Sequence, residues 1–395
     1  MAEVVPADAP LLVAAGAGHL EDAQDLLENG ANANMQTDKV RTPLHEASYQ
    51  GRAEIVKLLI QHDASIDAKD RQKNTPLHEA SKAGSIECAS VLIQAGADMN
   101  NTTSIGASCL YVAAREGHHL FIDWIIGAGA QVDYTTNTGW SALHRASYDG
   151  WSDVVEVLLN HHAPLEKRED KDGRTALHMA AERNHVAIID MLAKAGAAIE
   201  ATTNKGSTPL YFACLKGSTD AVRALLNHSA RVEAHQRFKW TPLNIASQKG
   251  YTDIVKLLLQ SSASLKTREN GNHYTPLHHA AMEGHVAIVK MLLDHTANIE
   301  VRSKNDSTPL HLAAAKGHSR VVKLLLQRGA NYKALTTEFK TPLDLAKKNQ
   351  KHEVVSLLSA AMGLSQDNDQ LSETMASEQS GLITTDTSSF LSATA

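Results

Sequence analysis

The chain has 395 residues, with 38 Lys and Arg against 44 Asp and Glu, which gives a formal net charge of -6. Such a balance does not predict nucleic acid as the partner, and an aromatic content of 4% leaves few rings for stacking on bases. The three cysteines, Cys88, Cys109 and Cys214, form neither a C-x-x-C pair nor an even framework. They predict reduced core thiols in a cytoplasmic or nuclear protein.

The first residues lack the pattern of a targeting segment. Residues 1–10 contain Glu3 and Asp8, and no basic stretch leads into an apolar one. The longest apolar run, residues 120–132, is interrupted by Asp123 and Gly127 and is too short to span a bilayer. We therefore expect an N-terminal extension over residues 1–7 and no membrane insertion.

From residue 8 onward one phrase returns every 33 or 34 residues, which indicates a single supersecondary unit stacked on itself. Five residues after each start stands an alanine, which predicts close contact between neighbouring helices. The eleven starts are Ala9, Thr42, Thr75, Ser108, Ser141, Thr175, Thr208, Thr241, Thr275, Thr308 and Thr341. A repeat array of this kind grows linearly and favours one elongated domain over residues 8–363.

Each unit has the same local pattern. Thr or Ser at the start caps a helix, Pro occupies its first turn, and a glycine such as Gly150 ends it in the left-handed conformation. A second helix follows with a paired apolar step such as Leu258–Leu259. About ten polar, turn-forming residues then predict a projecting hairpin, here called a finger, before the next unit.

The recurring T-P-L-H-x-A resembles the ankyrin repeat. The resemblance covers about residues 8 to 362 and implies an all-α solenoid of stacked helix-turn-helix units with projecting β-hairpin fingers. Departures are local: Tyr111 and Tyr211 replace the motif histidine, and Asn184 and Gln350 replace the turn glycine. A glycine common near the fingertip is replaced at Val40, Lys73, Lys239, His273 and Asp306.

The 21 histidines do not predict a metal or catalytic site. In the ankyrin repeat the motif imidazole bridges backbone groups of adjacent fingers, and neighbouring pairs such as His118–His119 diverge on a helix. Hydrolase, zinc-protease and phosphate-loop motifs are absent, and the acidic stretch 169–172 is expected in a solvated finger. We expect no catalytic residue, no metal and no cofactor.

The positions that the stack does not use for itself are the fingers and the exposed ends of the first helices, which line the concave groove in ankyrin arrays. Aromatic and basic residues gather there, and such residues dominate interface hot spots. Two fingers carry one extra residue, before Thr175 and Thr275, and insertions on one face often mark the binding face. The predicted partner-binding residues are Tyr49, Trp140, Tyr148, Arg174, Arg183, Lys216, Arg237, Phe238, Trp240, Lys249, Tyr274 and Lys316.

Residues 364–395 contain five acidic residues, no Lys or Arg and many Ser and Thr, which predicts a disordered acidic tail. Because the later groove is basic, this tail could compete there with an acidic segment of a partner. The resemblance also places Asn34 and Asn100 at the finger position that asparaginyl hydroxylation favours in ankyrin proteins.

The sequence thus predicts a monomeric, non-enzymatic scaffold or adaptor that binds a protein partner along its concave groove, with no nucleic acid and no membrane insertion. Two alternatives stay open. One is a substrate receptor of a ubiquitin ligase, although nothing after Gly363 resembles the appended box of such proteins. The other is a transcriptional co-regulator, although a basic groove has the wrong sign to cover a basic segment.

Overall fold

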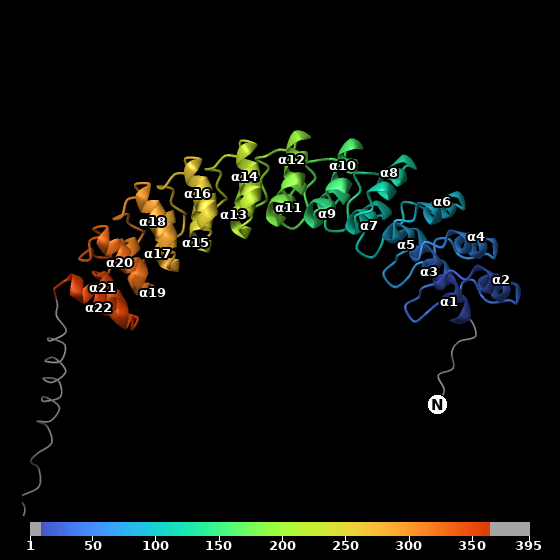
Figure 1. Cartoon of the computed structure of the whole chain (residues 1–395), viewed down its shortest axis with the longest axis horizontal. Coiled ribbons are helices and arrows are strands. Elements are labelled where there is room, and N and C mark those ends of the chain that lie inside the picture. The colour runs from blue at the N-terminus through green and yellow to red at the C-terminus, as the bar shows by residue number, and fades with distance from the viewer. Residues whose placement is uncertain (1–8, 364–395) are drawn as a thin grey trace, which may run out of the picture. The chain divides into compact units, whose positions relative to one another are not determined.

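The computed structural model describes residues 9–363, and every structural statement below concerns this part of the chain. It contains 22 short helices and no sheet, which confirms the all-α solenoid class (Figure 1). The predicted extension at 1–7 and the predicted tail at 364–395 lie outside the described residues. The chain divides into two compact units between Arg237 and Phe238, and each is described by itself.

Unit 1 holds the first seven layers, each a helix pair. Its first helices, α1 to α13 with odd numbers, pack against one another in chain order. The first helices are α1 (Ala9–Ala17), α3 (Pro43–Tyr49), α5 (Pro76–Ala83), α7 (Cys109–Glu116), α9 (Ala142–Asp149), α11 (Ala176–Arg183) and α13 (Pro209–Lys216). The second helices are α2 (Leu20–Glu28), α4 (Ala53–Gln61), α6 (Ile86–Gln94), α8 (His119–Gly127), α10 (Ser152–Asn160), α12 (Val186–Lys194) and α14 (Thr219–Asn227).

Unit 2 holds the last four layers and repeats the arrangement. First helices contact first helices, and second helices contact second helices. The first helices are α15 (Pro242–Lys249), α17 (Pro276–Glu283), α19 (Pro309–Lys316) and α21 (Pro342–Lys348). The second helices are α16 (Thr252–Gln260), α18 (Val286–Asp294), α20 (Ser319–Gln327) and α22 (His352–Ala361).

The capping phrase forms the helix starts as its residues predict. In α11 the Thr175 side chain caps the helix, and the Thr175 N-H donates to His178 Nδ1 at 3.2 Å. The opposite ring nitrogen, Nε2, lies 3.1 Å from the Ser207 carbonyl oxygen of the next finger. Because Nδ1 accepts from a backbone N-H, the proton must sit on Nε2, which donates to that carbonyl. The same bridge is made by His45, His78, His144, His278 and His311.

The turn between the helices requires a left-handed residue in close contact with the next layer. Gly150 has a φ of 91°, and a Cβ built there would lie 2.5 Å from Cε1 of His185. His185 in turn bonds to the Tyr148 carbonyl oxygen at 3.1 Å. Asn184 takes the same backbone conformation with a φ of 64°, as its place in the register predicts.

The recurrent alanines lie in the core. All eleven are at most 4% exposed, and the apolar pairs of the second helices are buried at one or both residues. Leu258, for example, is fully buried in α16. Because the alanines lie on first helices that contact each other from layer to layer, their small side chain sets the layer spacing.

The fingers are tight turns rather than strands. In the finger at 37–41 the Thr37 N-H donates to the Arg41 carbonyl at 3.0 Å, and within the described residues only the bridge between Thr135 and Ser141 meets the geometry of β pairing.

Successive fingers are joined by backbone hydrogen bonds. In unit 1 these run from Arg71 N to Lys39 O, Ser104 N to Gln72 O, Asn137 N to Ile105 O, Asp170 N to Thr138 O, Asn204 N to Asp172 O and Arg237 N to Lys205 O. In unit 2 they run from Asn270 N to Phe238 O, Lys304 N to Asn272 O and Thr337 N to Asn305 O. Each unit therefore has a continuous finger row.

Candidate partner-binding surface

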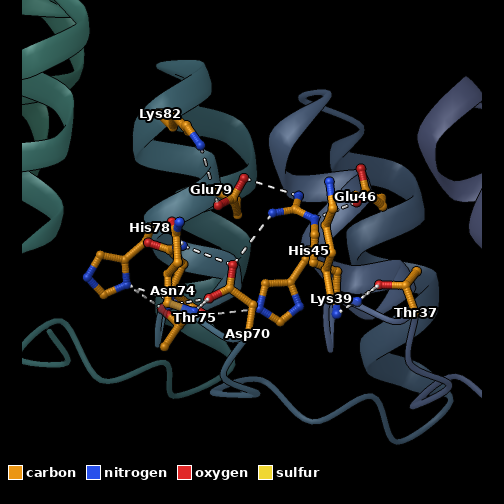
Figure 2. A network of polar contacts seen from close by, with 12 residues as sticks. Thr37, Lys39, His45, Glu46, Asp70, Asn74, Thr75, His78, Glu79 and Lys82 are labelled. Atoms are coloured by element: carbon orange, nitrogen blue, oxygen red, sulfur yellow. Dashed lines mark hydrogen bonds and ion pairs between the residues drawn. The ribbon is translucent and has the colours of Figure 1, made fainter. Parts of the chain in front are cut away.

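At the start of the finger row a hollow of about 710 Å³ opens between the fingers at 37–41 and 70–74 and helices α3 and α5. Figure 2 labels three carboxylates of its lining, Glu46, Asp70 and Glu79. They surround the guanidinium of Arg41, which also lines the hollow. The guanidinium reaches Glu46 at 2.5 Å, Glu79 at 3.1 Å and Asp70 at 3.8 Å. Burial opposes the charge of Arg41, but the hydrogen bonds to these glutamates outweigh it and raise its pKa, so the arginine stays charged.

Tyr49 is the one predicted binding residue that lines this hollow. It is 41% exposed, and the cations of Lys82 and Arg41 lie 5.4 Å and 5.9 Å from the centre of its ring. Glu79 is 1% exposed and holds both cations in place, with Lys82 Nζ at 3.9 Å. Tyr49 is thus a partly exposed ring beside two cations that are themselves paired with Glu79.

In the middle of unit 1, a cation-aromatic cluster forms around Tyr148 of α9, with Trp140 from the preceding finger and Arg183 from the end of α11. Trp140 and Tyr148 meet edge to face at 5.5 Å, and the Arg183 guanidinium lies 4.7 Å from the Tyr148 ring centre. Trp140 also packs against buried Tyr111 and Val112, so it is half-buried and contributes to the fold. Arg183 is exposed. The structure therefore brings these predicted residues together, with Arg183 as the outermost member.

Two further predicted cations are held by carboxylates. Arg174 bonds to Glu169 at 3.3 Å and to Glu182 at 2.9 Å, and Lys216 reaches Glu182 at 3.1 Å. The Arg174 side chain is only 15% exposed, so its visible role is to fix the finger. This part of the surface is less basic than the sequence predicts, because Glu182 neutralises part of its charge.

The extra residue in two fingers has a local structural cause. The Glu169 carboxylate accepts the backbone N-H groups of Lys171 at 3.0 Å, Asp172 at 2.7 Å and Arg174 at 3.3 Å. Burial would raise the pKa of Glu169, but these bonds outweigh it and lower the pKa. Glu269 makes the same bonds in the other long finger, to Gly271, Asn272 and Tyr274. The expectation of a solvated acidic stretch at 169–172 is therefore wrong for Glu169, which is 2% exposed because it caps its own loop.

In unit 2 three predicted aromatics have different surroundings. The Trp240 ring is tilted against His279, with 4.5 Å between ring centres. Tyr274 stacks on His278 at 5.4 Å and meets His279 edge to face at 5.6 Å. His279 is 2% exposed and its ring nitrogens lack a hydrogen-bond partner, while burial lowers its pKa to about 4. Trp240 and Tyr274 therefore cover a neutral imidazole. Phe238, two residues before Trp240, is 56% exposed, so more than half of its surface faces solvent.

The remaining predicted cations are exposed. Arg237 lies in the last finger of unit 1, and Lys249 and Lys316 end α15 and α19 of unit 2. The sequence interpretation missed two exposed apolar side chains on fingers, Ile105 at 54% and Phe339 at 79%. Phe339 occupies the fingertip glycine position and has a φ of 54°, so the register that identified Val40 and Lys239 would have found it.

The predicted hydroxylation positions lie on the surface with different environments. Asn34 is exposed, but its amide nitrogen donates to Asp63 O at 2.9 Å and its oxygen accepts from Ser65 N at 2.6 Å. Asn100 is exposed, and its backbone N-H donates to Asp98 at 2.9 Å. Hydroxylation at either position stays a prediction.

Many of the histidines within residues 9–363 have structural partners rather than a shared site. Besides the six motif histidines, His118, His185, His285 and His318 bond to carbonyl oxygens of the preceding layer. No cluster of three or more metal-ligating groups occurs in this part of the chain. Cys88, Cys109 and Cys214 are buried and unpaired, and burial raises the pKa of Cys109 to about 12. Over the same residues, none of the helices has the length and apolarity needed to cross a bilayer.

Comparison with known proteins agrees with the repeat architecture described above. No curated protein matches the sequence of the chain. The family model for ankyrin repeats, three copies long, matches residues 11–103, 110–203, 195–269, 263–336 and 297–370. Those matches extend over nearly the whole described part, with the motif residues at the helix starts, fingers and turns seen in the structure. The chain therefore belongs to the ankyrin-repeat family.

Proposed function

We propose that the chain is a non-enzymatic adaptor that binds a protein partner through its finger row and the exposed ends of its first helices. Ankyrin repeats are in general protein-protein interaction modules. The observation that carries the proposal is the Tyr148 cluster, in which Trp140, Tyr148 and Arg183 adjoin on a surface outside the alanine-centred core. Tyr, Trp and Arg are the side chains that most often dominate binding energy at interfaces.

The predicted residues fall into two groups with different expected effects. Tyr49, Arg183 and Phe238 are exposed, so their truncation should reduce partner affinity with little loss of stability. Trp140 and Trp240 are half-buried and pack on neighbouring side chains, so their truncation should reduce both. A binding role is therefore best tested on the exposed group.

The test is a quantitative capture of partners from native extract with the full chain as bait. Tyr49→Ala, Arg183→Ala and Phe238→Ala are compared with Arg223→Ala, which removes an exposed arginine from second helix α14. We expect at least one of the first three to weaken binding by more than about 1 kcal/mol, with the thermal midpoint unchanged. Retention of every partner by all three variants would place the interface elsewhere.

A further inference from the structure

The net charge of -6 is the sum over three segments, of which the first and last are acidic and the middle one is basic. Residues 1–237 carry 21 Lys and Arg against 30 Asp and Glu, a net charge of -9. Residues 238–363 carry 17 Lys and Arg against 9 Asp and Glu, a net charge of +8. Residues 364–395 carry five acidic residues and no Lys or Arg, a net charge of -5. The most basic and the most uniformly acidic segments are consecutive in the chain.

Most cations within residues 238–363 also lack a carboxylate partner among these residues. Within residues 238–363, a single ion pair joins a cation to a carboxylate, Arg328 Nη1 to Asp294 Oδ1 at 2.8 Å. In unit 1, by contrast, the Arg41 and Arg174 guanidiniums are each held by two or more carboxylates. Unit 2 therefore presents positive charge that its own folded residues do not neutralise.

Part of this charge lies on the finger row that also carries the exposed side chain of Phe339. Lys304 and Lys340 belong to the finger row, which the backbone bonds from Lys304 N to Asn272 O and from Thr337 N to Asn305 O hold together. Phe339 is 79% exposed on that row, and its positive φ is costly for a bulky residue. Lys249 and Lys316 end the first helices α15 and α19 of the same unit. This set, Lys249, Lys304, Lys316, Phe339 and Lys340, is here called the basic face.

We propose that residues 364–395 bind back onto the basic face of unit 2. Charge complementarity supports this occupant, because all its charged residues are acidic. Two apolar pairs, Leu382–Ile383 and Phe390–Leu391, supply side chains for contact with the exposed ring of Phe339. The segment follows Gly363, just beyond α22 of the same unit.

The length of the segment also suffices. Its 32 residues span at most about 110 Å when extended. A segment tethered to its own domain acts at a high effective concentration, so weak contacts are enough to populate the bound form. Exposed charge pairs are weak singly, so the contact should depend strongly on salt.

The contact is tested on the full chain with a carbodiimide, which joins a carboxylate to a lysine amine only when the two touch. We expect products between residues 364–395 and Lys249, Lys304, Lys316 or Lys340. Lys256, Lys290 and Lys323 are exposed on the second helices α16, α18 and α20 and serve as internal controls. Their yield should be several-fold lower, and products on the basic face should decline as salt rises from about 0.05 to about 0.5 M.

Two matched variants separate a specific contact from general attraction. Lys249→Glu with Lys316→Glu should abolish crosslinks at Lys304 and Lys340, whereas Lys256→Glu with Lys290→Glu makes the same change in net charge and should retain them. Equal effects of the two double variants, or the absence of products at low salt, would overturn the proposal. Mixing isotope-labelled and unlabelled chains identifies contact with a second copy, and mixed products in place of intramolecular ones would also overturn it.

Competition between the segment and a partner rests on the proposed function, but the contact does not. Replacing the five acidic residues by their amides should increase partner affinity several-fold at low salt and leave it unchanged at high salt. If crosslinks form and partner affinity is insensitive to the amides, the competition is overturned and the partner binds elsewhere. If crosslinks fail while Arg183→Ala still weakens binding, the contact is overturned and the proposed function stands.

Discussion

The motif histidines should make the array sensitive to mild acid. His78, His178 and His278 are buried, and burial lowers the pKa of each to about 4. Nδ1 accepts the N-H of the capping threonine, as in the Thr175–His178 pair at 3.2 Å. Protonation would place a hydrogen on Nδ1 against that N-H, so the neutral imidazole is required for the folded layer.

The sign and size of the effect follow from linkage. An ordinary histidine has a pKa of about 6.5, so the unfolded chain takes up protons first as the pH falls. The contribution of each histidine is fully present above about pH 6.5 and is lost as the pH falls through about 4. At pH 5 the loss is about 2 kcal/mol for each of the three, since one pKa unit corresponds to about 1.4 kcal/mol.

The chain itself supplies the substitution that tests this effect. Asn244 occupies the motif position in α15, where its Oδ1 accepts from Thr241 N at 3.3 Å and its Nδ2 lies 3.5 Å from Tyr274 O. His78→Asn, His178→Asn and His278→Asn should therefore retain the bridge without a titrating group. His235→Asn, at an exposed position, is the control.

Hydrogen exchange of the affected layers at pH 7 and pH 5, corrected for the intrinsic pH dependence of exchange, measures the local free energy of opening. The loss between the two pH values should be about 2 kcal/mol smaller in each motif variant than in the wild type. An unchanged loss in all three variants would refute the assigned tautomer and its role in stability.

Two further substitutions test the packing and the fingers. Ala280 is fully buried in α17, between α15 and α19, so Ala280→Leu should destabilise unit 2 by about 1 to 3 kcal/mol, with faster hydrogen exchange first in α15 and α19. Ala287→Leu, at an exposed position in α18, is the control, and unchanged exchange in α15 and α19 of the Ala280 variant would contradict the spacing role. Val40 has a φ of 63°, where a β-branched residue is strained, so Val40→Gly should raise the thermal midpoint and stabilise the first fingers by about 1 kcal/mol; a lower midpoint would show that the Val40 side chain contributes more than its backbone strain costs.

Much of the fold could be predicted because its signals are local. The Thr-Pro start of α17 and the left-handed Asn184 each depend on a few neighbouring residues, and the register repeats them through the chain. The buried alanines follow from the same register. Such features need no knowledge of distant contacts, so one sequence is enough to place them.

The candidate surface was harder to predict because exposure depends on the neighbouring layer. Trp240 and Phe238 lie two residues apart on one finger, yet the first covers His279 and the second is 56% exposed. The sequence predicts Arg174 as a cation available to a partner, but in the structure the carboxylates of Glu169 and Glu182 lie beside it. The sequence register places a residue on the finger row. The side chains that contact it come from other repeats, and the register does not determine their rotamers.

The distribution of charge links stability to recognition in this array. A segment with a net charge of +8 repels itself, and only one cation-carboxylate pair within residues 238–363 offsets this repulsion. An acidic segment on the basic face would therefore stabilise unit 2 as well as occupy it. The five carboxylates of residues 364–395 leave a net charge of +3 on the combined segment, so an acidic partner would still be attracted. Electrostatic attraction in this protein should accordingly be strongest around unit 2, while the aromatic contacts of the Tyr148 cluster act at short range in unit 1.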